Sequence, residues 1–240
     1  MVQKLPYLFL AVLFSLSSLT TSYAQEEKVY FSEALNKYLL KYNKLADKAI
    51  AAGRFDQAKS LFDSLVENHL EGTTIDPLNF EGYKTRLRST LDFDKPTVIY
   101  TYSSWCIPSA GEIPVLNKMA SRYGDMVDFV VLYFDNRKSV RKQARQFDRN
   151  VHVVYVDETT NDHMLTEKLM KQSLGTSLAV VVSASGEILD ISRRPPNHLD
   201  WPLDEQLATN FSFISRQITS VFIDTDKDVS DLPESYATWE

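Results

Sequence analysis

Residues 97–114 read TVIYTYSSWCIPSAGEIP, and the rest of the chain is interpreted outward from them. The first six residues, 97–102, are all β-branched or aromatic and predict a buried strand. Side chains with helical spacing follow, and the pattern ends at Gly124, a helix stop signal. The spaced positions are Glu112, Val115, Leu116, Met119 and Tyr123. Cys106, the only cysteine of the chain, lies where the strand gives way to the helix.

The position of Cys106 suggests a reactive thiol. We expect Cys106 to lie in the first turn of the helix, where unpaired backbone N–H groups and the positive end of the helix dipole stabilise an anion. A thiol placed there ionises more easily than a free one. This stretch is therefore where we look for chemistry.

A known family shares this pattern. A strand followed by Trp105, Cys106 and Pro108, and then by a helix with Glu112 and Pro114, resembles the thioredoxin superfamily. The run Glu112, Ile113, Pro114 is similar to that of the TlpA/ResA-like branch of exported thiol-disulfide oxidoreductases. The resemblance covers roughly residues 73–222. It implies a thioredoxin-like α/β fold, in which helices flank a central mixed sheet, with Cys106 as the nucleophile that attacks a disulfide.

Two positions depart from the family pattern. Ser109 occupies the place of the second cysteine, which in the family resolves the mixed disulfide. The family also has a cis-proline facing the cysteine pair, after Gly-Thr, and here the run reads Gly175, Thr176, Ser177. The resemblance thus implies a motif and groove formed by Trp105, Pro108, Glu112, Pro114, Thr176 and Ser177.

The first 24 residues have the features of a secretory signal peptide. An early Lys4 precedes an apolar run over 5–16, and small residues at Ser22 and Ala24 occupy the positions that a signal peptidase reads. The apolar run is short for a membrane span. We expect export, to the periplasm or the extracellular space, with no integral membrane segment in the mature protein.

Composition limits the classes of partner. The 240 residues carry a net charge of −6, so no nucleic-acid partner is expected. A single cysteine cannot form an intrachain disulfide. In an oxidising compartment, a lone thiol is either buried or kept for reaction or intermolecular pairing.

Residues 25–72 are predicted to form a separate N-terminal element. Two apolar stripes with helical spacing run over 28–69 and are separated by Gly53, which predicts an antiparallel helical hairpin. The pattern is similar to one tetratricopeptide-like helix pair, but no second copy follows and an array needs about three. Packing against the main domain is one interpretation, and a docking surface for a protein partner is the other.

The remaining elements alternate between strand and helix. We expect strands over 126–134 and 151–156, helices over 139–147 and 164–170, a β-hairpin over 178–183 and 187–191, and a closing helix over 205–222. Residues 223–240 are rich in acidic side chains and predict a flexible tail.

The sequence predicts no metal site and no cofactor. The four histidines lie far apart without ligand spacing, and the acidic run from Asp224 lacks the glycine and glutamate that a calcium loop needs. Asn210 starts a glycosylation sequon inside the closing helix, which leaves its modification open.

The function predicted from these residues is thiol chemistry with one sulfur. Ser109 cannot displace a mixed disulfide, because an alcohol is neither acidic nor soft enough to attack sulfur. Disulfide exchange or isomerisation through Cys106, with protein or small thiols as partners, is therefore one hypothesis. The alternative is a catalytically degenerate thioredoxin-fold binding or assembly module.

Overall fold

The described part of the chain contains a mixed β-sheet. The computed structural model describes residues 28–103, 105–106, 108–160, 162–196 and 200–224. In these residues the strand order is β1-β4-β3-β2-β5-β6, and β2, β3 and β4 are parallel, whereas β1, β5 and β6 pair antiparallel to their neighbours. The strands are β1 Glu81–Tyr83, β2 Thr97–Tyr102, β3 Asp128–Phe134, β4 Val151–Val156, β5 Leu178–Val182 and β6 Ile188–Arg193.

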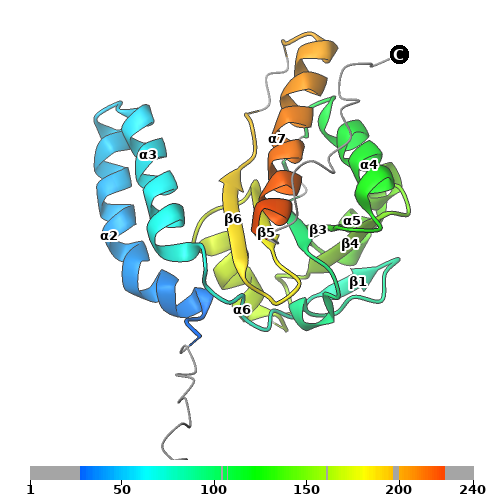
Figure 1. Cartoon of the computed structure of the whole chain (residues 1–240), viewed down its shortest axis with the longest axis horizontal. Coiled ribbons are helices and arrows are strands. Elements are labelled where there is room, and N and C mark those ends of the chain that lie inside the picture. The colour runs from blue at the N-terminus through cyan, green and yellow to red at the C-terminus, as the bar shows by residue number, and fades with distance from the viewer. Residues whose placement is uncertain (1–27, 104, 107, 161, 197–199, 225–240) are drawn as a thin grey trace, which may run out of the picture.

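Helices cover both faces of this sheet, as Figure 1 shows. One face packs against α4 (Glu112–Tyr123), α5 (Arg137–Gln143) and α7 (Leu203–Asp224). The other packs against α6 (Met164–Glu167), the π-helical turn Lys168–Gln172 and the base of the N-terminal helices. The central mixed sheet flanked by helices, expected from the sequence, is confirmed.

Successive side chains of the central strand β2 point to opposite faces of the sheet, and both faces are covered. In β2, Val98, Tyr100 and Tyr102 face the α4 and α7 layer, whereas Ile99 faces the opposite core. All six residues of β2 are buried. A strand that is covered on both faces gains from burial at each position, which suits the β-branched and aromatic residues of β2.

The N-terminal residues form the predicted helical hairpin. Helix α2 (Phe31–Ala51) and helix α3 (Phe55–Leu65) are joined through Gly53, whose φ of +69° is a left-handed conformation that glycine adopts without strain. A π-helical turn, Val66–Leu70, follows α3. In Figure 1 the outer part of the hairpin stands away from the sheet.

The base of the hairpin is fastened to the sheet domain. Phe31 and Leu35 share a buried cluster with Ile188 of β6. The buried carboxylate of Asp76 accepts hydrogen bonds from the Ser32 backbone N–H at 2.9 Å and from the Ser32 hydroxyl at 2.6 Å. A carboxylate there satisfies an otherwise unpaired N–H of the first turn of α2 and suits the positive end of the helix dipole.

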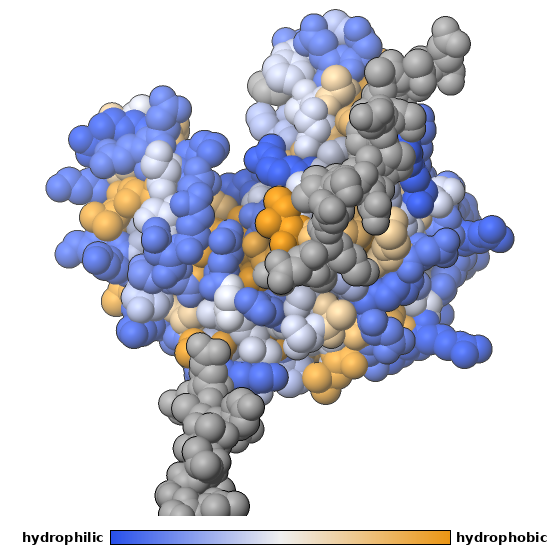
Figure 2. Space-filling view, in the orientation of Figure 1, coloured by the Kyte–Doolittle hydropathy of each residue, from blue (hydrophilic) through white to orange (hydrophobic). Residues whose placement is uncertain are grey.

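A groove remains between the hairpin and α7. It has a volume of about 940 Å³, and its lining comes from α2, α3, the edge strand β6 and α7. Figure 2 shows this hollow with apolar residues at its bottom and polar residues on its walls. The hairpin thus contributes a wall of the groove besides its contact with the sheet.

Two predicted segments fall wholly or mostly outside the described residues. The signal peptide over 1–24 is one, and the tail over 223–240 is the other, except that α7 continues to Asp224. None of the described helices is both long and apolar enough to cross a membrane.

The central strand gives the first prediction. Val131 of β3 is buried between Tyr100 of β2 and Val153 of β4, so Val131→Asp places an unpaired carboxylate inside the sheet. We expect a loss of more than about 4 kcal/mol in the free energy of unfolding. Denaturant unfolding measures it, with Val29→Asp as the matched control at an exposed valine. Equal stability of the two variants would contradict the strand assignment.

The two hydrogen bonds that Ser32 of α2 donates to Asp76 give the second prediction. Asp76→Ala should lower the free energy of unfolding by about 1 to 2 kcal/mol, because two hydrogen bonds at the start of α2 are lost. Hydrogen exchange should quicken along α2 in particular. The control is Asp63→Ala, which removes only the exposed pair of Asp63 with Lys59 and should cost about 0.5 kcal/mol or less. Unchanged hydrogen-exchange rates in α2 would show that the bonds between Ser32 and Asp76 do not hold the hairpin in place.

Candidate functional site

Cys106 lies in a turn after β2 and not in a helix. Its backbone N–H donates to the Ser103 carbonyl at 2.9 Å, and its side chain is half-buried. Helix α4 begins at Glu112, six residues later. The expectation that Cys106 occupies the first helical turn is therefore wrong. Because the effect of a helix dipole fades beyond the first turn, any stabilisation of a Cys106 thiolate has to come from elsewhere.

Contacts with α7 explain the late start of α4. The Ala110 N–H donates to the Gln206 side-chain oxygen at 2.9 Å, and the Asn210 amide donates to the Ser109 hydroxyl at 2.7 Å. Gly111 lies against the α7 backbone so closely that a Cβ there would come within 2.7 Å of Gln206 and Leu207. Residues 109–111, which immediately precede α4, are thus in direct contact with α7.

The same contacts define the environments of Ser109 and Asn210. The Ser109 hydroxyl is directed to α7 through its bond from Asn210. Asn210 is only 5% exposed, and its amide also donates to the Gln206 carbonyl at 2.7 Å. A glycan on Asn210 would require this buried contact to open, so the folded structure does not support the sequon as a modification site.

Ser177 faces the cysteine. The Ser177 hydroxyl oxygen lies 3.8 Å from the Cys106 sulfur, although the two residues are 71 positions apart. Its φ of +69° is left-handed, which is uncommon for a residue other than glycine. The neighbouring Leu178 N–H donates to the Thr101 hydroxyl at 2.9 Å, which joins this turn to the end of β2. Thr176 is half-buried in the same turn.

Arg194 was not predicted from the sequence to lie at this site. It follows β6, and its guanidinium forms an ion pair with Glu112 of α4. The Arg194 side chain is 7% exposed and that of Glu112 is 12% exposed. The guanidinium also donates to the Thr101 carbonyl at 3.2 Å and to the Ser177 hydroxyl at 3.1 Å. One arginine therefore joins β2, α4 and the Ser177 turn.

Tyr102 completes this buried network. Its hydroxyl donates to Glu112 at 2.5 Å, and the Arg194 guanidinium lies 3.8 Å from the centre of its ring. Burial, followed by the nearby Glu112 charge, raises the pKa of Tyr102 well above its usual range, so the phenol stays protonated. Burial by itself lowers the pKa of Arg194, but Tyr102 and Glu112 outweigh it and the net shift is upward. Arg194 therefore stays positively charged across the physiological pH range.

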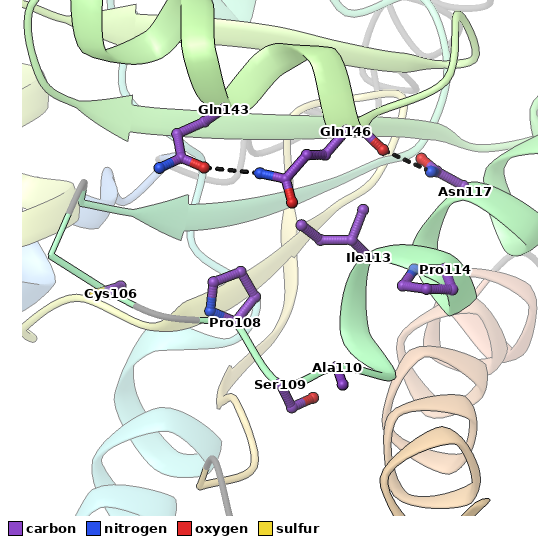
Figure 3. A pocket seen from close by; sticks show the side chains of 9 residues that line it. All are labelled: Cys106, Pro108, Ser109, Ala110, Ile113, Pro114, Asn117, Gln143 and Gln146. Atoms are coloured by element: carbon purple, nitrogen blue, oxygen red, sulfur yellow. Dashed lines mark hydrogen bonds between the residues drawn. The ribbon is translucent and has the colours of Figure 1, made fainter. Parts of the chain in front are cut away.

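The other predicted motif residues have different surroundings. Trp105 is 70% exposed, and Pro114 is exposed on the first turn of α4. A pocket of about 560 Å³ opens beside Cys106, and Figure 3 shows the side chains of Gln143 and Gln146 across it from Pro108 and Ser109. Its lining bears no formally charged side chain: Cys106, Pro108, Ser109, Ala110, Ile113, Pro114, Asn117, Gln143 and Gln146.

Metal-ligating side chains do not gather at this site. Within the described residues, no group of three or more His, Cys, Asp or Glu side chains could hold a metal ion. His152 lies 3.8 Å from Asp128, and His163 lies 3.6 Å from Glu81. The chemistry available from the described side chains is therefore that of one thiol beside a hydroxyl and a buried guanidinium.

Comparison with known proteins gives one match in sequence and several in structure. No protein-family model matches the chain. Over 74 residues it is 34% identical to a thiol:disulfide interchange protein TxlA homolog from Synechocystis, a match that covers 30% of this chain and 41% of that protein. The match therefore spans less than half the length of that relative.

Solved structures of thiol-disulfide oxidoreductases are similar at low identity. The thioredoxin domain of one from Bacteroides vulgatus is 14% identical, with a TM-score of 0.46, over 61% of this chain and 96% of the other. StoA from Bacillus subtilis is 14% identical, with a TM-score of 0.39, over 56% of this chain and 96% of the other.

The fold class rests on the topology of the described strands and helices. Three parallel strands with antiparallel strands on either side, and helices on both faces, form the central mixed sheet flanked by helices that the family resemblance implied. The described residues thus have a thioredoxin-like fold, and 74 residues of the chain are similar in sequence to a thiol:disulfide interchange protein.

Proposed function

We propose that this chain is an exported protein that exchanges disulfides through a single thiol, Cys106. The observation that carries the proposal is the half-buried Cys106 at the edge of a pocket, with the Ser109 hydroxyl bound to Asn210. Export is supported by the signal-like residues 1–24.

The exchange step needs only one protein sulfur. The Cys106 thiolate attacks one sulfur of a substrate disulfide, a new S–S bond forms, and the electron pair of the broken bond leaves on the other sulfur as a thiolate. An external thiolate then attacks the substrate sulfur of the mixed disulfide. It forms a disulfide with that half of the substrate and returns Cys106 as a thiolate. No net oxidation of the protein results.

Ser109 is why an external thiol is required. A serine hydroxyl is not ionised at neutral pH and does not attack sulfur, so the mixed disulfide has no internal route to release. The bond from Asn210 also directs the hydroxyl to α7. These features support monothiol exchange or isomerisation over dithiol reduction.

The pocket supports a polypeptide disulfide as the substrate. Its amide and apolar lining suits a peptide backbone, which has no charge and many hydrogen-bonding groups. Glutathione disulfide carries carboxylates that are best held by Arg or Lys side chains, and none lines this pocket.

A second function, a binding or assembly module, is supported by the groove beside the hairpin. β6 is an outer strand of the described sheet, and its residues line this groove of about 940 Å³. In this case Cys106 would have no part in the function. Its reactivity in the native protein therefore separates the two proposals.

The monothiol proposal predicts a trapped intermediate. Mixed with an excess of an aromatic disulfide whose released thiol absorbs visible light, the native protein should release one equivalent of thiol and retain the other half covalently. Mass spectrometry should locate the adduct on Cys106, and the adduct should persist until an external thiol is added. Cys106→Ser should give no release.

The Ser109→Cys variant should gain the ability to release the mixed disulfide from Cys106 without an external thiol. With a second thiol in the resolving position, the adduct should leave without external thiol, and an intramolecular disulfide should remain. Persistence of the adduct in Ser109→Cys would contradict the assignment of Ser109 to the resolving position. Absence of any adduct in the native wild type would overturn the exchange proposal and favour the binding module.

A further inference from the structure

We propose that Ser177 donates a hydrogen bond to the Cys106 thiolate and that Arg194 is the positioning residue that orients the Ser177 hydroxyl. This inference rests on the proposed function, because a stabilised thiolate matters only if Cys106 reacts. Its geometric basis is a chain of two contacts. Arg194 Nη2 lies 3.1 Å from Ser177 Oγ, and Ser177 Oγ lies 3.8 Å from Cys106 Sγ.

The contact with Arg194 leaves the Ser177 hydroxyl proton available for the contact with Cys106. A guanidinium has only donors, so Ser177 must accept from Arg194. Its single hydroxyl proton is then free to point to the Cys106 sulfur, which is within hydrogen-bonding reach for sulfur. A thiolate can only accept, so ionisation of Cys106 requires Ser177 to be the donor. Hydrogen bonds to an ionised group are the stronger kind.

Arg194 is held so that it can act on Ser177. Glu112 binds one end of the guanidinium, the Thr101 carbonyl accepts from the other, and the Tyr102 ring lies against its face. The Arg194 backbone N–H also donates to the Ser177 carbonyl at 2.8 Å. The main chain and the side chain of Arg194 therefore fix Ser177 together, in a left-handed conformation.

The charged and titratable groups around the thiol come from four directions. Arg194 approaches from the end of β6, Glu112 from α4, Tyr102 from β2 and Tyr133 from β3. The negative charge of Glu112 would disfavour a thiolate. However, Glu112 forms an ion pair with Arg194 and accepts a hydrogen bond from the Tyr102 hydroxyl. The Coulombic effect of Cys106 is one of the causes that raise the pKa of Arg194, which is consistent with attraction between the two.

The test compares Ser177→Ala and Ser177→Gly with wild type. Both variants lose the hydroxyl, but glycine accepts a φ of +69° more readily than alanine does. Iodoacetamide alkylation of Cys106 is followed over a range of pH, and thiolate formation is followed in parallel by ultraviolet absorbance. In both variants we expect the midpoint of the pH profile to move upward and alkylation at neutral pH to slow about tenfold. Rates should converge with wild type at alkaline pH, where all thiols are ionised.

Each outcome decides the inference. Equal slowing in the alanine and glycine variants, confined to lower pH, supports a hydroxyl that stabilises the thiolate. Slowing by the same factor at every pH would indicate a structural effect and overturn it. An unchanged pH profile, with adduct formation intact, overturns this inference and leaves the exchange proposal standing. A wild-type Cys106 that resists alkylation at all pH values overturns both.

Discussion

The ion pair between Arg194 and Glu112 is the interaction on which the site depends. It is buried where the end of β2, the start of α4 and the segment after β6 meet, and Tyr102 and Ser177 bond to its two partners. Removing one member of a buried pair leaves the other charge without a partner, at a cost of about 3 kcal/mol or more. The positions of Ser177 and of the α4 start are therefore coupled through one contact.

This network gives the site a chemistry that differs from that of a dithiol motif. A single sulfur, Cys106, lies beside a hydroxyl that a buried guanidinium holds in place. The Ser109 hydroxyl accepts a hydrogen bond from Asn210 of α7. Thiolate stabilisation through Ser177 and Arg194 would then substitute for the helix start, which lies too far from Cys106 to contribute.

Local patterns were sufficient for the scaffold but not for the site. The buried strands, α4, α7 and the β5–β6 hairpin follow from period-two and helical spacing, because each pattern reflects the layer that covers it. The family resemblance anticipated that Cys106 and Ser177 would meet. The importance of Arg194 could not be predicted, because its partner Glu112 is 82 positions away and its segment has no distinctive local pattern. The late start of α4 has the same origin, since residues 109–111 are fixed by Gln206 and Asn210 of α7.

The most direct measurement is a double-mutant cycle on the pair that organises the site. The free energy of unfolding is compared for wild type, Glu112→Gln, Arg194→Met and the double variant, from denaturant curves at neutral pH. If the buried pair joins α4 to the segment after β6, each single variant should lose about 3 kcal/mol or more. The double variant should then lose clearly less than the sum, with a coupling energy of about 2 kcal/mol. Additive losses within about 0.5 kcal/mol would show that the two residues act independently and would contradict the account.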